Sequence, residues 1–142
     1  MKNYSGVIII RDDGTMLIQH RDNKSSISNP GKWCIPGGMV QAGEINEDAA
    51  RREIWEECGY NIDKLSILED QEYTLNDGER AVRHIYWAIY DGTSKIKCLE
   101  GQEIKFLFLN EILDLDVTSG QKELFLKVYN LYFLPYRPQL VF

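Results

Sequence analysis

Hydrophobic and polar positions alternate near the start of the chain in a way that predicts strands. The apolar run 7–10 precedes the turn sequence DDGT, and MLIQ at 16–19 resumes the apolar pattern, as expected of two strands joined by a turn. Residues 22–32 are rich in Asn, Ser, Pro and Gly and predict a loop. Pro36 favours extended backbone before it, so the stretch 33–38 is expected to be short and extended.

Two segments have the apolar spacing and composition of helices. Within residues 46–58 the apolar residues recur every four positions and form one stripe, made of Ala50, Ile54 and Cys58. Gly59 stands where helices commonly end, and Asn46 is suited to cap the start of this helix. The segment 119–134 predicts a closing helix whose inner side carries Leu124, Phe125, Val128, Leu131 and Tyr132.

Further strands are predicted at 64–75, 82–92 and 103–110, separated by the turn sequences NDGE and DGTS. Because short turns join the strands, we expect antiparallel pairing. On the strand 82–92, His84 and Tyr86 should lie on one face of the sheet. Arg83, Ile85 and Trp87 should lie on the other face. The order of elements predicts an α+β fold in which helices cover a mixed sheet. With 142 residues and no linker or repeat, residues 1–142 are expected to form a single domain.

Composition narrows the classes of function. The net charge of −6 argues against a binder of nucleic-acid polymers, but a bound metal ion would still allow a small anionic ligand. The three cysteines are odd in number and widely spaced, so we expect reduced, part-buried thiols and neither a zinc site nor disulfides. The start of the chain lacks a signal-peptide pattern, and no apolar run approaches the roughly 20 residues of a membrane span. A cytoplasmic protein is therefore expected.

The helix predicted at 46–58 crowds negative charge onto one face. Glu53, Glu56 and Glu57 are spaced i, i+3 and i+4, and like charges at such spacings destabilise a helix by about 0.2–0.5 kcal/mol each. A solvated surface is the ordinary explanation for three such acids taken alone. Carboxylates that converge in this way are also the ligands that Mg²⁺ prefers. The glycines Gly37 and Gly38 just upstream would let backbone carbonyls approach the same ion.

The order and spacing of these residues resemble the Nudix box. That motif runs Gly, five residues, Glu, seven residues, Arg-Glu, an apolar residue, any residue, Glu-Glu, any residue, Gly and usually an apolar residue. The chain fills it over 23 residues, with Gly38, Glu44, Arg52, Glu53, Ile54, Glu56, Glu57, Gly59 and Tyr60. One departure is Ile45-Asn46, where many members carry Ser or Thr and then Pro.

The resemblance implies an α/β/α sandwich that hydrolyses a nucleoside diphosphate linked to another group, using Mg²⁺ or Mn²⁺. The implied metal ligands are Glu53, Glu56, Glu57 and a carbonyl of Gly37 or Gly38. By the same resemblance, Arg52 and Glu44 would orient the acids or assist deprotonation of water. A glutamate before the late strand often joins such a site, and the EGQ stretch favours Glu100 over Glu103. The general base is then Glu53, Glu44 or Glu100.

The substrate is less well determined by the sequence. Arginines can hold phosphate and aromatic rings can stack a base, which makes Arg21, Trp33 and Arg83 the preferred substrate contacts, with Tyr73, His84, Tyr86 and Trp87 as further candidates. The EGQ loop favours a nucleoside triphosphate, including oxidised ones such as 8-oxo-dGTP, over nucleotide sugars or dinucleoside polyphosphates. The proline that many ADP-ribose hydrolases of this family carry beyond the box is missing.

Two other classes of protein remain as alternatives. A non-catalytic Nudix-fold regulator that binds nucleotides would be expected to lose some box acids, and this chain keeps all of them. An interaction module would use the apolar tail 131–142, which could also serve a homodimer.

Overall fold

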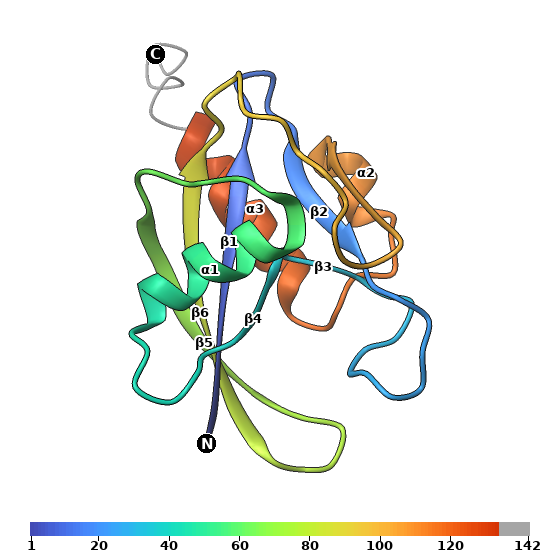
Figure 1. Ribbon diagram of the computed structural model, residues 1–142. Helices are drawn as coiled ribbons and strands as arrows, with labels where there is room; N and C mark the ends of the chain where they lie inside the picture. Colours follow the sequence, from blue (N-terminus) through green and yellow to red (C-terminus); the bar gives the residue numbers. More distant parts are fainter. Residues whose placement is uncertain (134–142) are drawn as a thin grey trace, which may run out of the picture.

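The computed structural model describes residues 1–133, which fold around one mixed β-sheet (Figure 1). The strands are β1 Lys2–Ile10, β2 Met16–His20, β3 Trp33–Cys34, β4 Gly37–Met39, β5 Ser66–Thr74, β6 Arg80–Ile89 and β7 Glu103–Leu107. The helices are α1 Asn46–Cys58, α2 Leu109–Leu113 and α3 Gln121–Phe133. The strand and helix segments expected from the sequence are present. The strand predicted at 103–110 ends at Leu107, because the short helix α2, which was not foreseen, begins at Leu109.

The sheet has the order β3-β2-β1-β6-β5, with β4 also pairing with β1 and β7 with β2. The expectation of antiparallel pairing is correct for β5–β6 and for the pairs formed by β2. It does not extend to the centre, where β1 and β6 run parallel from Lys2↔Ala81 to Ile10↔Ile89 and make the sheet mixed, as predicted. Short turns fix the direction only of neighbouring strands, whereas α1 lies in the long connection between β1 and β6.

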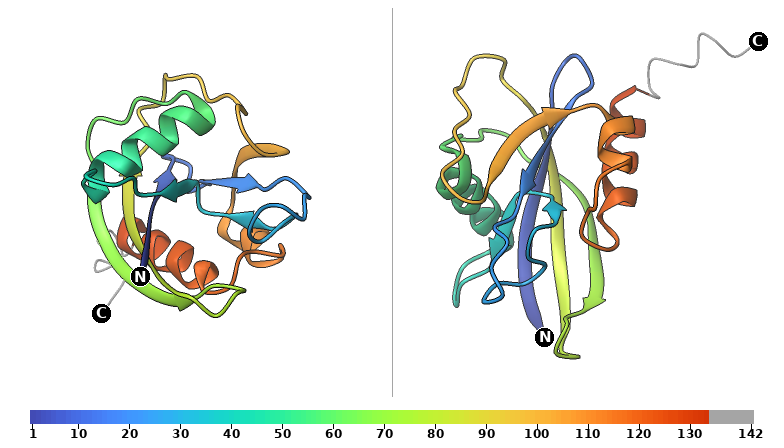
Figure 2. Two further views of the ribbon diagram at one scale, coloured as in Figure 1. Left: turned by 60° about the horizontal axis from the view of Figure 1, so that its bottom comes forward. Right: turned by 90° about the vertical axis from the view of Figure 1, so that its right-hand side faces the viewer.

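The sheet is covered on both faces, as expected for a sandwich (Figure 2). Helix α1 lies on one face, over an apolar layer that contains Val7, Ile9, Leu17 and the helix residues Ala50, Ile54 and Cys58. Helix α3 lies on the opposite face, together with α2, over a layer that contains Ile8, Ile10, Met16, Ile18 and Phe125. The apolar run of β1 therefore serves two cores, since successive residues point to opposite faces.

Several local expectations are settled by these layers. Gly59 ends α1 in the left-handed conformation with φ 71°, as predicted. Asn46 does not cap the helix, because Ile45 occupies the N-cap position and no side chain bonds there. In α3, Leu131 is 46% exposed and is not on the inner side. Aromatic residues take that place instead, and Phe133 packs beside the β1–β2 turn at Gly14.

Cys34 and Cys58 are buried free thiols, whereas Cys98 is exposed rather than part-buried. Between residues 1 and 133, no helix has the length and apolar content of a membrane span. The sequence suggested the apolar tail 131–142 as a contact surface for an interaction module or a homodimer. Most of this tail lies outside the described residues.

Candidate metal centre and adjoining pockets

Three carboxylates meet at one end of the apolar layer between α1 and the sheet. Glu53 and Glu57 project from α1, and Glu100 comes from the loop before β7; one oxygen of each lies within 4.8 Å of the others. Glu57 is buried, Glu53 is half-buried and Glu100 is exposed. The group is therefore open to solvent on the side of Glu100 and closed on the side of the helix.

Glu57 is the most unusual member of this group. Its side chain is 2% exposed, and its Oε1 accepts the backbone N–H of Gly37 at 3.0 Å. Its Oε2 is buried without a hydrogen-bond partner among the described residues. Burial, followed by the nearby charges of Glu53 and Glu100, raises the pKa of Glu57 well above its ordinary value. Because buried polar atoms are normally satisfied, the unpaired oxygen fits an oxygen-preferring cation such as Mg²⁺.

The two glycines of β4 allow the sheet and helix to approach each other at this point. A Cβ on Gly38 would lie 2.4 Å from Cδ of Glu53, and one on Gly37 would lie 2.2 Å from the carbonyl oxygen of Ser5. Gly37 and Gly38 pair with Gly6 and Ser5 of β1. A side chain at either position would therefore push against the carboxylate or the central strand.

Arg52 connects the acids of the helix to the loop before it. Its Nε and Nη2 donate to the two carboxylate oxygens of Glu44 at 2.8 and 2.9 Å, and Nη1 donates to Glu53 at 2.9 Å. This bidentate pair lowers the pKa of Glu44 to about 2. Burial outweighs the same guanidinium at Glu53, whose pKa is raised. Arg52 also donates to Glu56 at 3.2 Å and to the carbonyl of Met39 at 2.9 Å, so one cation orders the acidic end of α1.

A cleft of about 220 Å³ opens over the carboxylates. Its lining combines the acids with the glycines of β4 and residues of β2 and the loop after it: Gln19, Arg21, Asp22, Ile27, Gly37, Gly38, Glu53, Glu57, Glu100 and Gly101. Arg21 is the cation of this lining; its Nε donates to the carbonyl of Ser28 at 2.9 Å. Acids and a guanidinium that face one cleft can hold a metal ion and a phosphate chain together.

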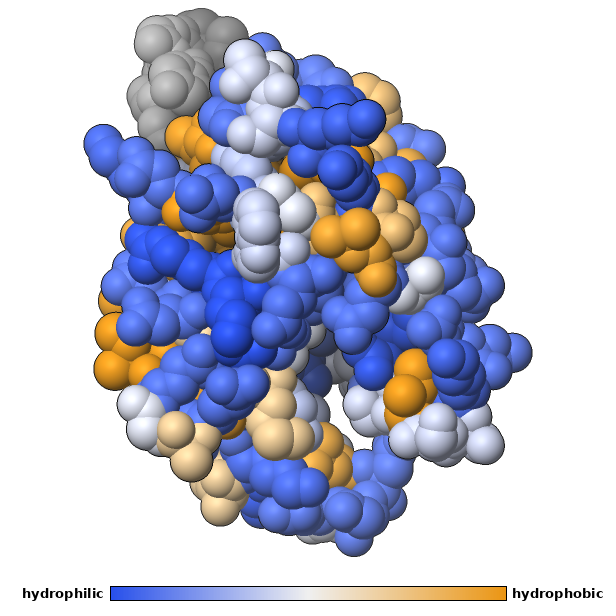
Figure 3. Space-filling view, viewed as in Figure 1, coloured by the Kyte–Doolittle hydropathy of each residue, from blue (hydrophilic) through white to orange (hydrophobic). Residues whose placement is uncertain are grey.

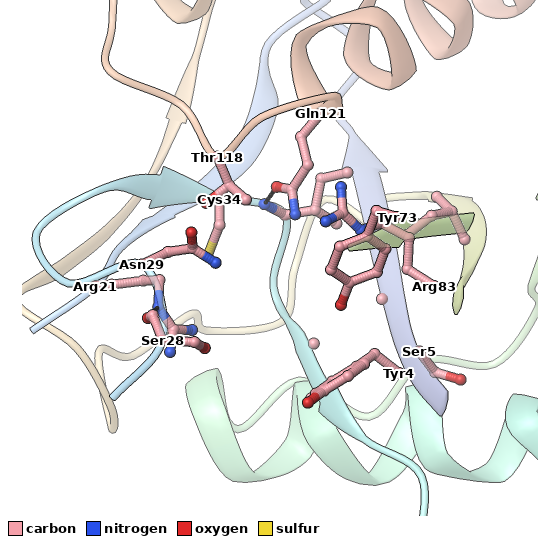
Figure 4. Close-up of a pocket in the computed structure, with 15 residues that line it drawn as sticks. Tyr4, Ser5, Arg21, Ser28, Asn29, Cys34, Tyr73, Arg83, Thr118 and Gln121 are labelled. Carbon is pink, nitrogen blue, oxygen red and sulfur yellow. Dashed lines mark hydrogen bonds between the residues drawn. The ribbon is translucent and has the colours of Figure 1, made fainter. Parts of the chain in front are cut away.

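A second pocket, of about 80 Å³, adjoins the cleft and shares Arg21, Gly37 and Gly38 with it. Figure 4 shows Arg21 and Asn29 on one side, Tyr73 and Arg83 on the other, and Thr118 and Gln121 above. The hydroxyl of Thr118 is buried without a hydrogen-bond partner in the described part of the chain. Gln121 uses its Oε1 to accept the N–H of Ile35 at 2.7 Å.

The buried guanidinium of Arg83 gives this pocket a flat wall. Its carbon lies 3.8 Å from the centre of the Tyr73 ring, and its Nη1 donates to Gln71 at 2.8 Å and to the carbonyl of Ser119 at 3.1 Å. Burial lowers the pKa of Arg83, although the group remains a cation at neutral pH. The pocket continues into a larger hollow of about 600 Å³ between residues 26–29 and the β5–β6 turn, visible in Figure 3.

Comparison with known proteins assigns the family. The model of the NUDIX domain matches residues 2–128. This chain belongs to the Nudix family. The nucleoside triphosphatase NudI of Escherichia fergusonii is 39% identical over 72 residues, which cover 51% of this chain and 48% of that protein. The match thus spans about half the length of this relative.

Two solved structures have the same fold as this Nudix domain. The MutT NUDIX hydrolase of Burkholderia pseudomallei is 25% identical, with a TM-score of 0.77 over 89% of this chain and 97% of that one. The Ap4A hydrolase of Caenorhabditis elegans is 22% identical, with a TM-score of 0.77 over 96% and 99% of the two chains. The predicted Nudix fold is therefore confirmed.

The Nudix fold brings some of the predicted site residues together and separates others. Glu53, Glu57 and Glu100 converge, whereas Glu56 is exposed and bonds to Arg52. Glu103 forms an ion pair with Lys105 at 2.6 Å.

Among the residues assigned to substrate, Arg21, Tyr73 and Arg83 line the pockets. Trp33 stacks on His20 with ring centres 4.4 Å apart and is not part of either lining. His84 bonds to Asp70 and Asn3. Tyr86 and Trp87 pack with the two apolar layers, on opposite faces of β6 as predicted.

Sequence reasoning did not identify Tyr4, Thr118 or Gln121 as pocket residues. Tyr4 precedes the apolar run 7–10, Thr118 lies between predicted elements, and Gln121 lies in the first turn of the predicted closing helix. None of them has a spacing that marks it as a pocket residue. Only the fold brings these segments together.

Proposed function

We propose that this chain is a hydrolase that depends on Mg²⁺ or Mn²⁺ and cleaves the phosphoanhydride of a nucleoside triphosphate into a nucleoside monophosphate and pyrophosphate. The observation that carries the proposal is the unpaired, buried Oε2 of Glu57, beside two further carboxylates within 4.8 Å. The nucleoside triphosphatase NudI among the relatives supports this substrate class. The net charge and the size of the cleft favour a small molecule over a polymer.

The residues divide the work according to their contacts. When bound, Mg²⁺ would neutralise phosphate oxygens and lower the pKa of a water molecule. Glu53, Glu57 and Glu100 would hold it, with a carbonyl of Gly37 or Gly38 completing the set. Both oxygens of Glu44 are occupied by Arg52, which suits an orienting role. Of the three candidates for the base that accepts a proton from water, Glu53 and Glu100 line the cleft and Glu44 does not. The base is therefore Glu53 or Glu100.

Arg21 would contact the phosphate chain, because it lines both the acidic cleft and the second pocket. The nucleoside would occupy the second pocket, where the rings of Tyr4 and Tyr73 offer apolar faces. Arg83 lines the same pocket and stacks on the ring of Tyr73, so it would hold that ring in place. Trp33 is not a substrate contact in this proposal, because its ring is stacked on His20.

A dinucleoside polyphosphate is the second candidate substrate. The hollow of about 600 Å³ shares Tyr4, Tyr73 and Arg83 with the nucleoside pocket and offers room for a second group. The fold shared with the Ap4A hydrolase is compatible with this substrate.

The test is a panel of nucleoside triphosphates, dinucleoside polyphosphates and nucleotide sugars with Mg²⁺, with the products identified by mass. A triphosphatase releases monophosphate and pyrophosphate, whereas the sugar and dinucleotide substrates give other pairs of products. Glu57→Gln is the matched control and should lose most of the activity. Turnover that is unaffected by a chelator, or by this substitution at saturating Mg²⁺, would contradict the proposal.

A further inference from the structure

Gln19 is a buried polar residue at the end of an apolar strand. The preceding residues of β2, Met16 to Ile18, are fully buried hydrophobics, and Gln19 is itself only 4% exposed. It lies on the face of β2 that Leu17 presents to α1, and it lines the acidic cleft. Burying an amide is unfavourable unless both of its ends form hydrogen bonds, so the partners of this side chain show what it does.

Both ends of the Gln19 amide are used, and one of them reaches the loop that carries Glu100. Its Nε2 donates to the backbone carbonyl of Glu100 at 3.2 Å. Its Oε1 accepts the thiol of Cys34 at 3.7 Å, across the β2–β3 pair. A carbonyl oxygen can only accept, which fixes the amide in this orientation. Burial raises the pKa of Cys34 to about 12, so its thiol keeps the proton that it donates.

Backbone and side-chain bonds from Leu99 and Gln102 hold the same loop on either side of Glu100. The backbone N–H of Gln102 donates to the carbonyl of His20 at 2.8 Å, and its side chain donates to the carbonyl of Arg21 at 2.8 Å. On the other side, the N–H of Leu99 donates to the carbonyl of Glu57 at 2.9 Å. The carbonyl of Glu100 accepts two side-chain bonds, from Gln19 and from the exposed thiol of Cys98 at 3.4 Å. Gln19 is the buried one of these two donors.

We propose that Gln19 is a positioning residue that holds Glu100 within reach of Glu53 and Glu57 and so completes the metal-binding group. The inference rests on the proposed function, since it takes the three acids to bind the cation. Without the amide, the loop would keep the bonds of Leu99 and Gln102, but the backbone of Glu100 would lose its buried donor and its exposed carboxylate would be held less firmly beside Glu53 and Glu57. Groups that orient metal ligands in this way typically contribute 10–100-fold to metal affinity.

The test is a double-mutant cycle read as Mn²⁺ affinity, with free Mn²⁺ measured by electron paramagnetic resonance and no nucleotide present. Gln19→Met keeps the length of the side chain and removes the donor, and we expect the affinity to fall about tenfold. If Gln19 acts through Glu100, then adding Gln19→Met to Glu100→Gln should cause little further loss. The matched control is Gln71→Met, which removes a glutamine from the Arg83 network and should leave Mn²⁺ affinity unchanged.

Each outcome has a distinct meaning. Unchanged Mn²⁺ affinity in folded Gln19→Met, or losses that add fully with Glu100→Gln, would overturn the inference and leave the proposed function intact. A wild-type chain that binds no Mn²⁺ would overturn both. If Gln19→Met does not fold, Gln102→Ala carries the test, because this exposed residue loosens the same loop. Its expected loss is several-fold and should likewise disappear in the Glu100→Gln background, and a loss that persists there would refute the role of the loop.

Discussion

Replacing Glu57 by Gln should stabilise the metal-free protein while removing its response to metal. In the wild type, a buried carboxylate has one oxygen without a partner and faces two other acids within 4.8 Å. The substitution removes this charge and keeps the shape of the side chain. The oxygen of the new amide can still accept the N–H of Gly37.

The size of the gain can be bounded from the chemistry of the wild-type side chain. At pH 7 the folded chain can avoid the charge by keeping Glu57 protonated, which costs at most about 1.36 kcal/mol for each pH unit above the ordinary pKa of 4.5. That limit is about 3.4 kcal/mol at pH 7. Since the buried amide would also lack a full set of partners, we expect a gain of about 1–2 kcal/mol. For a chain of this size, the melting temperature should rise by about 3–8 °C.

The dependence on pH has a definite sign. The pKa of Glu57 is raised in the folded chain, so between the unfolded and folded pKa values the folded state binds more protons than the unfolded state. The stability of the wild type therefore falls as the pH rises through this window. The advantage of Glu57→Gln should be largest near neutral pH and should shrink as the pH approaches 4.5.

The assay is thermal unfolding of both proteins in a chelator and in Mn²⁺, across this pH range. A cation at 100 times its Kd stabilises the folded state by about 2.7 kcal/mol, so the order of stability should reverse when Mn²⁺ is added. A Glu57→Gln protein that is less stable than the wild type in chelator, yet gains as much from Mn²⁺, would refute the reasoning.

Four further substitutions test other contacts of the site. Gly37→Ala should destabilise the fold by about 2–3 kcal/mol in chemical denaturation, because its Cβ would lie 2.2 Å from a backbone oxygen of β1. Gly38→Ala should leave stability nearly unchanged and weaken Mn²⁺ binding at least tenfold in the same titration, because its Cβ displaces the movable carboxylate of Glu53. Arg52→Lys should lower kcat about tenfold in a pyrophosphate-release assay, because an ammonium group cannot make the bidentate pair. Thr118→Val should raise stability by about 1 kcal/mol by removing the unpaired hydroxyl, while raising KM if that hydroxyl contacts the nucleoside.

The elements that could be predicted from the sequence are those whose signals are local. The helix at 46–58 was found with its correct bounds because its apolar stripe and Gly59 both mark it. Helix α2 was missed because five residues are too few to show a period. The parallel pairing of β1 with β6 was missed because it joins Lys2 to Ala81, and no local pattern encodes such a contact.

In the site, too, the residues marked by a local pattern could be predicted, and those placed by contacts between distant segments could not. The box acids on α1 could be identified because one helix turn sets their spacing. The approach of Glu100 depends on how its loop crosses the end of α1, through the bond from Leu99 to Glu57. Gln19 and Thr118 could not be singled out, since a polar residue next to an apolar segment is ordinary until its burial is known.

The parallel pair at the centre of the sheet has a consequence for synthesis of the chain. Strand β1 cannot obtain its long partner until β6, which ends at Ile89, has been made. Ala50, Ile54 and Cys58 of α1 bury against a layer that includes Tyr86 and Ala88 of β6. A nascent chain that stops before β6 therefore exposes this stripe to water, and we expect such fragments to aggregate or to recruit chaperones. The acidic helix is for this reason a poor candidate for transplantation as an isolated peptide.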